Sequence, residues 1–519
     1  MITNDNLPDG WVNTFLGEIA EWGSGGTPSR RVKEYFEGDI PWIKTGELNQ
    51  KYISDSEEKI SRQAVEKSSA KIFPKGSVGI AMYGATIGKL AIWNVDASTN
   101  QACAVAKIDT SLLFNEFLYY FLLSEKSSLI KAGKGGAQPN ISQGVIKSWS
   151  INLPPFNEQH RIVAKIEELF SEIDKGVESL KTAKAQLHVY RQALLKHAFE
   201  GKLTAQWRSN NPDKVVPAEE LLRSIEQARE ERYQQQLTNW QTAVEKWEFN
   251  GKEGKKPSKP KRNLNNSKKI DASHLNLPSN WDCVNLESLL LEGPTNGYSP
   301  KAGENAKGTK SLKLTATTSC KMLINQDTIK YLYEEIEEGS KYWLKPGDVL
   351  VQRANTIDYV GSTAIYQGSH NDFIYPDLMI RLRFYSPILS VYIWHFLNYS
   401  KTRLFFRKNA TGIAGSMPKI SGEILKSTPV QITGYSEMEI LTQELDAKLS
   451  IIDRFEDDCN LAIQQAEMLR QSILKKAFSG QLIPQDPTDE PASELLKRIQ
   501  AEKAERETTT KKQKVKSSR

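Results

Sequence analysis

Cysteine is scarce in this chain, with four residues in 519: Cys103, Cys283, Cys320 and Cys459. They lie far apart and form no C-x-x-C pair, so the sequence predicts neither a zinc site nor a disulfide framework. Small core residues are their expected role. The six histidines show no metal-ligand spacing either, so no metal-binding residue is predicted.

Long apolar runs are also missing. No stretch of eighteen apolar residues occurs, and the most apolar segments, residues 114–123 and 388–396, are too short to cross a bilayer. The first eight residues lack the basic and apolar regions of a signal peptide. We therefore expect a cytoplasmic protein without a membrane partner.

Motifs for catalysis are incomplete. Residues 84–89 resemble a phosphate loop but have three residues between the glycines instead of four, which favours a turn between strands. Leu153-Pro-Pro-Phe156 resembles the catalytic loop of amino-methyltransferases, yet its leucine has no oxygen to hold a target amine. We interpret it as the stop before a helix, with Asn157 as the N-cap. Pro376-Asp377 lacks the further acidic ligands of a nuclease, so no catalytic or cofactor-binding residue is predicted.

An internal repeat is the most informative pattern present. Residues 191–203, Arg-Gln-Ala-Leu-Leu-Lys-His-Ala-Phe-Glu-Gly-Lys-Leu, return in similar form as residues 470–482, about 279 residues further on. Such a long period indicates a duplicated domain with its connecting helix and not a solenoid. Between the conserved anchors the copies differ, as residues 23–31 and 292–300 show. This pattern predicts two heads with different targets, with uneven drift of surface loops as the alternative.

A heptad pattern follows each head. In the first copy the seam residues are Ile166, Ile173, Leu180, Leu187 and Leu194, with Leu169, Gly176, Ala183, Tyr190 and His197 between them. In the second copy they are Leu445, Ile452, Cys459, Ala466 and Ile473, with Lys448, Phe455, Ala462 and Leu469 between them. Such narrow stripes predict two helices of about 45 residues that pack on each other as an antiparallel pair.

The predicted fold class is α+β, with two mixed α/β heads joined by two long antiparallel coiled-coil helices in a pseudo-two-fold repeat. We place the first head at residues 1–156 and the second at 276–434. The long helices are expected at 157–203 and 435–482. Residues 204–275 would form a helical extension and a basic linker, and residues 483–519 a helical and basic tail.

The formal net charge of +6 suits a polyanionic partner. Two segments, residues 251–262 and 511–519, are locally rich in Lys and Arg, and we interpret them as solvated segments that no core could order. Either segment could contact phosphates or serve solubility alone. In the extension, a thin apolar stripe could bind a partner or lie on the chain's own coiled coil, and it consists of Leu222, Ile225, Tyr233, Leu237, Trp240, Val244 and Trp247.

The order of the motifs resembles the specificity subunit of type I restriction-modification enzymes. The motifs are Leu-Pro-x-x-Trp opening each half, Gly84 to Lys89, Gln138-Pro-Asn-Ile-Ser142, Leu153 to Gln159, and Ala-Phe-x-Gly-x-Leu used twice. The resemblance implies two target-recognition domains that each read half of a bipartite site in double-stranded DNA, and a non-catalytic chain. It also implies two modification (methyltransferase) subunits and restriction/motor subunits as partners, which would carry S-adenosylmethionine, Mg²⁺ and ATP.

Base recognition needs Arg or Lys for guanine and Asn or Gln for adenine, displayed on loops. On this basis we predict DNA contacts in the first head from Arg30, Arg31, Lys44, Lys89, Lys134 and Gln138. In the second head we predict them from Tyr298, Lys301, Lys313, Arg353, Asn355, Arg407, Lys408 and Lys419. For each residue alone, a surface cation or turn role is an equal alternative.

Two other functions stay open at this point. One is a stand-alone DNA-binding scaffold, which copurification with a methyltransferase would argue against. The other is a single-chain DNA methyltransferase, which a methyl-transfer assay on the isolated chain would reveal.

Overall fold

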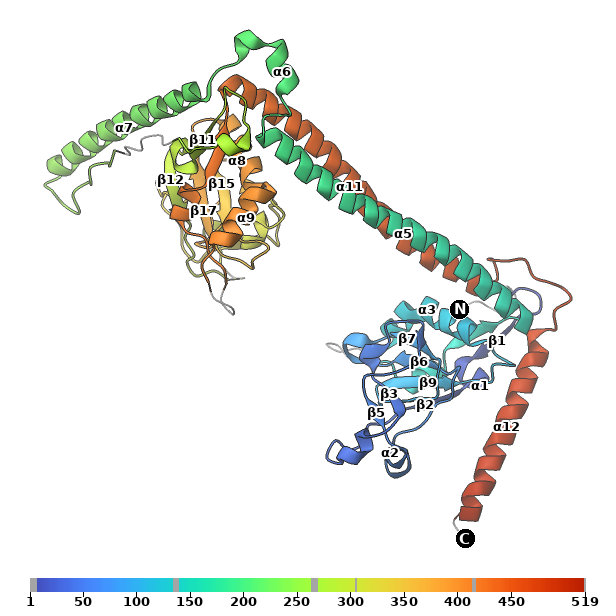
Figure 1. The fold of residues 1–519 in the computed structure, drawn as a ribbon. Helices are drawn as coiled ribbons and strands as arrows, with labels where there is room; N and C mark the ends of the chain where they lie inside the picture. The colour runs from blue at the N-terminus through green and yellow to red at the C-terminus, as the bar shows by residue number, and fades with distance from the viewer. Residues whose placement is uncertain (1–6, 134–139, 263–268, 304–305, 413–416, 518–519) are drawn as a thin grey trace. The chain divides into compact units, whose positions relative to one another are not determined.

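The computed structural model describes residues 7–133, 140–262, 269–303, 306–412 and 417–517 (Figure 1). Contacts divide the chain into two units, one of residues 1–182 with 459–519 and one of residues 183–458. Each unit contains one head and part of both long helices. Among the described helices, none has the length and apolar composition that crossing a membrane requires.

The first head is built on a mixed five-stranded sheet with strand order β2-β9-β6-β7-β4. Its strands are β2 (Glu21–Ser24), β9 (Cys103–Lys107), β6 (Val78–Ala81), β7 (Leu90–Trp93) and β4 (Tyr52–Ile53). A smaller sheet joins β5 (Lys59–Ile60), β3 (Ile40–Ile43) and β8 (Ser98–Thr99), and the helices are α1 (Leu16–Ile19), α2 (Arg62–Lys67), α3 (Asn115–Ala132) and α4 (Gln143–Lys147). Residues 84–86 form a 3-10 turn between β6 and β7, which confirms the turn predicted there.

The second head repeats the core of this arrangement. Its sheet has the order β12-β17-β15-β16, and its strands are β12 (Glu292–Asn296), β17 (Met379–Arg383), β15 (Val349–Gln352) and β16 (Thr363–Ile365). The remaining elements are the pair β13 (Lys310–Leu312) and β14 (Ile329–Tyr331) and the helices α8 (Pro387–Asn398), α9 (Ser400–Asn409) and α10 (Gly422–Lys426). The alternating apolar strands bury Val349, Val351 and Leu382 in the core of this unit.

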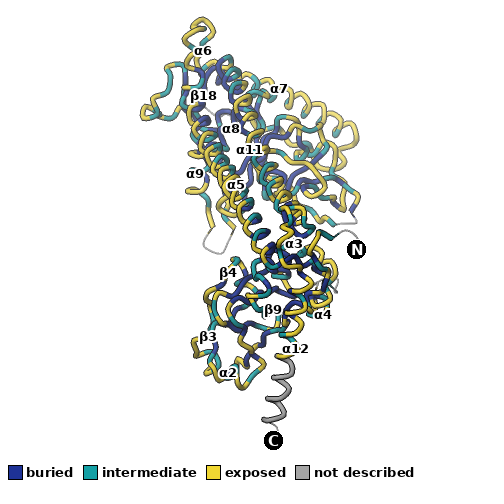
Figure 2. The backbone as a smooth tube through the Cα atoms, turned by 90° about the vertical axis from the view of Figure 1, so that its right-hand side faces the viewer, coloured by how far each residue is buried: buried dark blue, intermediate teal, exposed yellow. Residues whose placement is uncertain are grey.

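Each head is closed by an antiparallel strand pair just before its long helix. β1 (Val12–Phe15) pairs with β10 (Ser150–Leu153) in the first head, and β11 (Asp282–Asn285) pairs with β18 (Pro429–Ile432) in the second. The long helices follow directly as α5 (Phe156–Phe199) and α11 (Tyr435–Phe478), so Asn157 lies inside the helix and not at its N-cap. The two helices run side by side (Figures 1 and 2).

A buried carboxylate locks each helix start to its head. Trp11 Nε1 donates a 3.0 Å hydrogen bond to Glu158, and Trp281 Nε1 donates a 3.0 Å bond to Glu437. Both glutamates are buried. The repeated Leu-Pro-x-x-Trp motif and the helix start are therefore one structural unit, used twice.

The seam between α5 and α11 differs from the predicted pattern by one residue in its second set of positions. The residues from Ile166 to Leu194 at every seventh position are buried or half-buried, as predicted. The second set of seam residues follows each of them by four residues, whereas the predicted set followed by three. The second set in α5 is Phe170, Val177, Lys184, Arg191 and Ala198, and in α11 it is Leu449, Glu456, Ile463, Arg470 and Ala477. The predicted Tyr190, Phe455 and Leu469 are 54, 55 and 51% exposed.

Ion pairs explain this shift. In the second unit Arg191 pairs with Asp453 and lies 3.3 Å from Glu456, and in the first unit Arg470 pairs with Asp174. The Arg470 guanidinium also lies 4.8 Å above the Phe170 ring. Arginine can occupy such a position because it buries its methylene stem while its charged end stays paired. The apolar pattern of the sequence instead predicted the preceding residues, Tyr190 and Leu469, at these positions.

Candidate DNA-reading edges

Equivalent backbone hydrogen bonds build the same loop edge in both heads. In the first head Met82 N donates to Ala102 O at 2.8 Å, and Ile141 N donates to Met82 O at 2.8 Å. In the second head Arg353 N donates to Leu378 O at 2.7 Å, and Ile420 N donates to Arg353 O at 2.9 Å. We call these loops the reading edges, and they comprise residues 24–31, 82–89, 99–102 and 140–142 in the first head and residues 296–301, 353–359, 375–379 and 417–421 in the second.

Glycine lets the chain pass close to this edge. A Cβ atom on Gly25 would lie 1.9 Å from the Thr99 carbonyl oxygen, and one on Gly297 would lie 2.2 Å from the Pro376 carbonyl oxygen. Neither approach is possible for a residue with a side chain. The glycines of the divergent segments 23–31 and 292–300 therefore serve the shared frame, while the residues around them differ.

In the first head two of the predicted contact residues are already held by carboxylates. Arg30 lies 2.7 Å from Glu58, and Lys44 lies 3.1 Å from Glu57 and 3.2 Å from Glu58. The hydrogen bond from Arg30 lowers the pKa of Glu58, and those from Glu57 and Glu58 raise the pKa of Lys44. To contact DNA, either cation has to exchange a carboxylate for a base or phosphate.

The other predicted residues of the first head are less engaged. Lys89 directly precedes β7, and its Nζ donates a 2.6 Å hydrogen bond to Asn49 Oδ1. Arg31 is exposed. Lys134 and Gln138 lie outside the described residues. Sequence reasoning did not select Gln101, whose amide oxygen accepts a 2.5 Å hydrogen bond from Thr27 on this edge. Its position in the Asn-Gln pair after β8 was the available signal.

In the second head Arg353 stands at the position equivalent to Met82, as predicted from the repeat. Asn355 Nδ2 donates a 2.7 Å bond to Gln352 Oε1. The buried Gln352 amide in turn donates 3.0 Å bonds to Leu314 O and Thr317 Oγ1. This chain of amides fixes the Asn355 side chain at the end of β15.

A second cationic group flanks these two residues. Arg403 and Arg407 on α9 both donate to the Asp358 carbonyl oxygen, at 2.8 and 3.3 Å. Burial lowers the pKa of Arg403, and the neighbouring Arg407 charge lowers it further. Lys419 is exposed, and its backbone forms a β-bridge with Ala354. Lys408, the residue after Arg407, is also exposed. The structure thus gathers five predicted residues, Arg353, Asn355, Arg407, Lys408 and Lys419, around residues 353–359.

The remaining predicted residues of the second head lie apart from that group. The Tyr298 ring stacks on Tyr342 at 5.1 Å, a partner that sequence reasoning missed. Lys313 Nζ donates a 3.0 Å bond to Asp327 O and so serves its own loop. Lys301 is exposed, and its carbonyl oxygen accepts from Tyr333 N at 3.2 Å.

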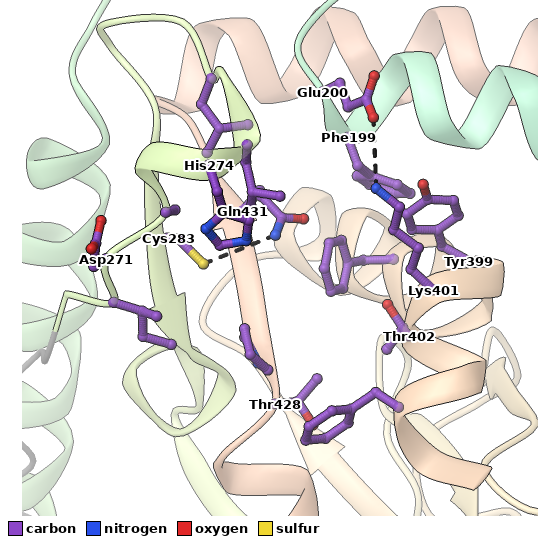
Figure 3. Close-up of a pocket in the computed structure, with 17 residues that line it drawn as sticks. Phe199, Glu200, Asp271, His274, Cys283, Tyr399, Lys401, Thr402, Thr428 and Gln431 are labelled. Atoms are coloured by element: carbon purple, nitrogen blue, oxygen red, sulfur yellow. Dashed lines mark hydrogen bonds and ion pairs between the residues drawn. The ribbon is translucent and has the colours of Figure 1, made fainter. Parts of the chain in front are cut away.

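The apolar pocket of the second unit is a poor candidate for catalysis (Figure 3). It has a volume of about 240 Å³ and is lined mainly by apolar residues, together with Cys283 and His274. Gln431 Nε2 contacts the Cys283 sulfur at 3.9 Å, and burial raises the pKa of that thiol to about 11. At neutral pH the sulfur is therefore a thiol and not a nucleophilic thiolate.

Among the described residues, no three His, Cys, Asp or Glu side chains are grouped closely enough to hold a metal ion.

Comparison with known proteins shows which proteins the chain resembles. Residues 8–181 match the family model described as "Type I restriction modification DNA specificity domain". The EcoKI specificity subunit of Escherichia coli (strain K12) is 24% identical over 517 residues, which cover 96% of each chain. Over nearly its whole length, the chain is therefore similar to a type I restriction-modification specificity subunit.

Two further comparisons agree with this resemblance. The EcoR124I/EcoR124II specificity subunit of Escherichia coli is 32% identical over 189 residues, which cover 34% of this chain and 46% of that one. A solved chain from the work "Structural basis underlying complex assembly and conformational transition of the type I R-M system" covers 92% of this chain and 99% of its own length. Its TM-score is 0.62 at 16% identity, which shows a shared fold. The EcoKI and EcoR124I/EcoR124II relatives are both named as specificity subunits of type I restriction enzymes.

Proposed function

We propose that this chain is a specificity subunit that reads a bipartite site in double-stranded DNA, one half-site with each head, and directs adenine methylation and restriction by partner subunits. The observation that carries the proposal is the shared backbone frame of the two reading edges, which presents different side chains in each head. Arg353 stands where the first head has Met82, for example. A fixed frame with exchanged side chains suits two sites that are read by the same geometry but differ in sequence.

Selection of DNA from a random library tests this function. The full-length chain, assembled with its modification subunits, should enrich two short fixed sequences separated by a gap of unselected bases. Enrichment of a single continuous site, or of no sequence, would contradict the proposal.

Two equivalent apolar patches support docking of two modification subunits. Val189 and Tyr190 on α5 are 67 and 54% exposed, and Met468 and Leu469, at the equivalent positions of α11, are 64 and 51% exposed. Large apolar side chains exposed in pairs mark protein interaction surfaces. In this proposal the partners supply S-adenosylmethionine, Mg²⁺ and ATP sites, and this chain supplies the surfaces that hold them.

Charge placed in these patches should weaken assembly. We expect Tyr190→Asp and Leu469→Asp each to remove one modification subunit, because an interface core excludes an unpaired carboxylate at a cost of several kcal/mol. Mass measurement of the assembled complex would show one lost subunit for each single variant and two for the double variant. His188→Asp, one residue outside the patch on α5, is the control. Full assembly of the double variant would place the partner surface elsewhere.

A further inference from the structure

The helix after the first long helix forms an arm with the basic segment that follows it. α7 (Ala218–Phe249) ends at Asn250, where Gly251 and Lys252 both have positive φ angles of 75° and 66°. Lys252 N donates a 2.9 Å hydrogen bond to Trp247 O, which completes the turn. Residues 251–262 then run back along the helix (Figure 1). We call α7 with residues 251–262 the arm.

Indole hydrogen bonds hold the returning segment against the helix. Trp247 Nε1 donates to Gly254 O at 3.2 Å, and Trp240 Nε1 donates to Pro257 O at 3.0 Å. Residues 251–262 are mostly exposed, as expected for a solvated segment, but their backbone is hydrogen-bonded to α7. Three residues of the predicted apolar stripe, Tyr233, Trp240 and Trp247, contact this segment. Leu222 and Ile225, at the start of the stripe, are instead buried in the core of the second unit, which also includes residues of both long helices.

Cations meet the aromatic rings in a regular register. Lys256 lies 5.7 Å from the Trp247 ring, Lys259 lies 5.8 Å from the Trp240 ring, and Arg262 lies 5.9 Å from the Tyr233 ring. Seven helical residues rise about 10.5 Å and three residues of an extended proline-type helix rise about 9.3 Å, so the two repeats stay in step. This match fixes the positions of the cations along the arm.

The base of the arm is anchored to the second head. Arg229 donates 2.8 Å bonds to the carbonyl oxygens of Leu290 and Glu287, and Arg232 pairs with Glu292 at the start of β12. Leu221 and Ile225 are buried there. A cleft of about 770 Å³ at this junction is lined by five cationic and three carboxylate side chains. The arm is therefore a fixed extension of the head with a positive base.

The exposed surface of residues 251–262 is strongly charged and offers little apolar area for a partner. Residues 251–262 carry six Lys or Arg residues, all exposed, and one carboxylate, Glu253. The aromatic rings are covered by the returning segment, and Phe249 is the large apolar side chain of the arm that stays exposed. Protein interfaces rely on a buried apolar or aromatic core, whereas phosphate binding requires only positioned cations.

We propose that the arm binds the DNA phosphate backbone, independently of sequence, beside the half-site read by the second head. This proposal rests on the proposed DNA-reading function. It gives the basic segment a positioning role, since phosphate contacts fix the register of a protein on the duplex while the reading edge distinguishes bases.

Salt dependence of DNA binding tests the arm. In the full-length chain, the triple variant K252Q/K255Q/K261Q removes three cations that no aromatic ring holds. For a duplex of arbitrary sequence, we expect the slope of log affinity against log salt to become less steep by about 2 to 3, because each neutralised phosphate contributes about 0.9. The preference for the selected half-sites should stay unchanged.

A control variant corrects for the loss of net charge. K196Q/K475Q/K476Q removes three exposed lysines from α5 and α11, and its salt slope should remain that of the unmodified chain. Equal slopes for the two triple variants would overturn the arm proposal, as would loss of an acidic protein partner from K252Q/K255Q/K261Q with its DNA binding intact. Failure of the DNA-reading function would appear separately, as a lack of half-site preference in the unmodified chain.

Discussion

Replacing residues 12–153 by the corresponding head of another specificity subunit should change one half-site completely and leave the other unchanged. The boundaries follow the structure, because β1 and β10 pair with each other and Trp11 and Glu158 both remain outside the exchanged segment. The exchange therefore keeps the contact that joins the head to α5. DNA selection or mapping of methylated adenines would measure both half-sites.

The reciprocal control is Arg353→Ala in the second head. Loss of one bidentate base contact costs about 1 to 3 kcal/mol, so this variant should weaken binding by roughly 5- to 150-fold and relax specificity in the other half-site alone. A change in both half-sites after either substitution would show that the heads do not read independently.

Removing the Glu437 carboxylate should strongly destabilise the second unit. Glu437 is fully buried and accepts hydrogen bonds from Trp281 Nε1 at 3.0 Å, Asn280 Nδ2 at 2.7 Å and Thr204 Oγ1 at 2.6 Å, and it also pairs with Arg208. In Glu437→Ala the arginine loses its buried partner, which costs about 3 to 5 kcal/mol. Urea unfolding followed by tryptophan fluorescence would measure the loss.

Glu158 provides a matched comparison in the first unit. It accepts from Trp11 Nε1 at 3.0 Å and from Gln485 Nε2 at 3.4 Å, both neutral donors, and burial raises its pKa. In both Glu158→Gln and Glu437→Gln the amide oxygen can still accept a bond from the indole. Glu437→Gln also loses the ion pair with Arg208, so Glu158→Gln should cost less stability. Equal losses would show that the arginine contributes little to the second lock.

The internal duplication could be recognised from the sequence because both copies have the same residue types at the same spacing. Trp11 matches Trp281 and Glu158 matches Glu437 by their places in the repeat alone, and both pairs form the same junction between head and helix. The two long helices followed from their seven-residue period, since residues such as Ile166 and Leu194 repeat along one face. Local patterns of this kind depend on the chain alone.

The residues of the reading edges could be predicted from the sequence only in part. Loop composition pointed to Arg353 and Asn355, and the structure places them beside Lys419 at the end of β15. The same reasoning could not show that Arg30 and Lys44 lie against Glu57 and Glu58. Whether a cation is free depends on which carboxylates the fold brings to it.

The sequence by itself determined that two heads and two long helices exist, because apolar periodicity and a repeated motif encode burial locally. Only the tertiary structure decided that Arg191 and Arg470 occupy the seam, and that Trp240 and Trp247 hold the basic segment on α7. In both cases a polar or charged side chain is placed by a partner distant in sequence or on a separate segment. The free energy of such a contact comes from pairing with that partner, and residue order alone does not specify it.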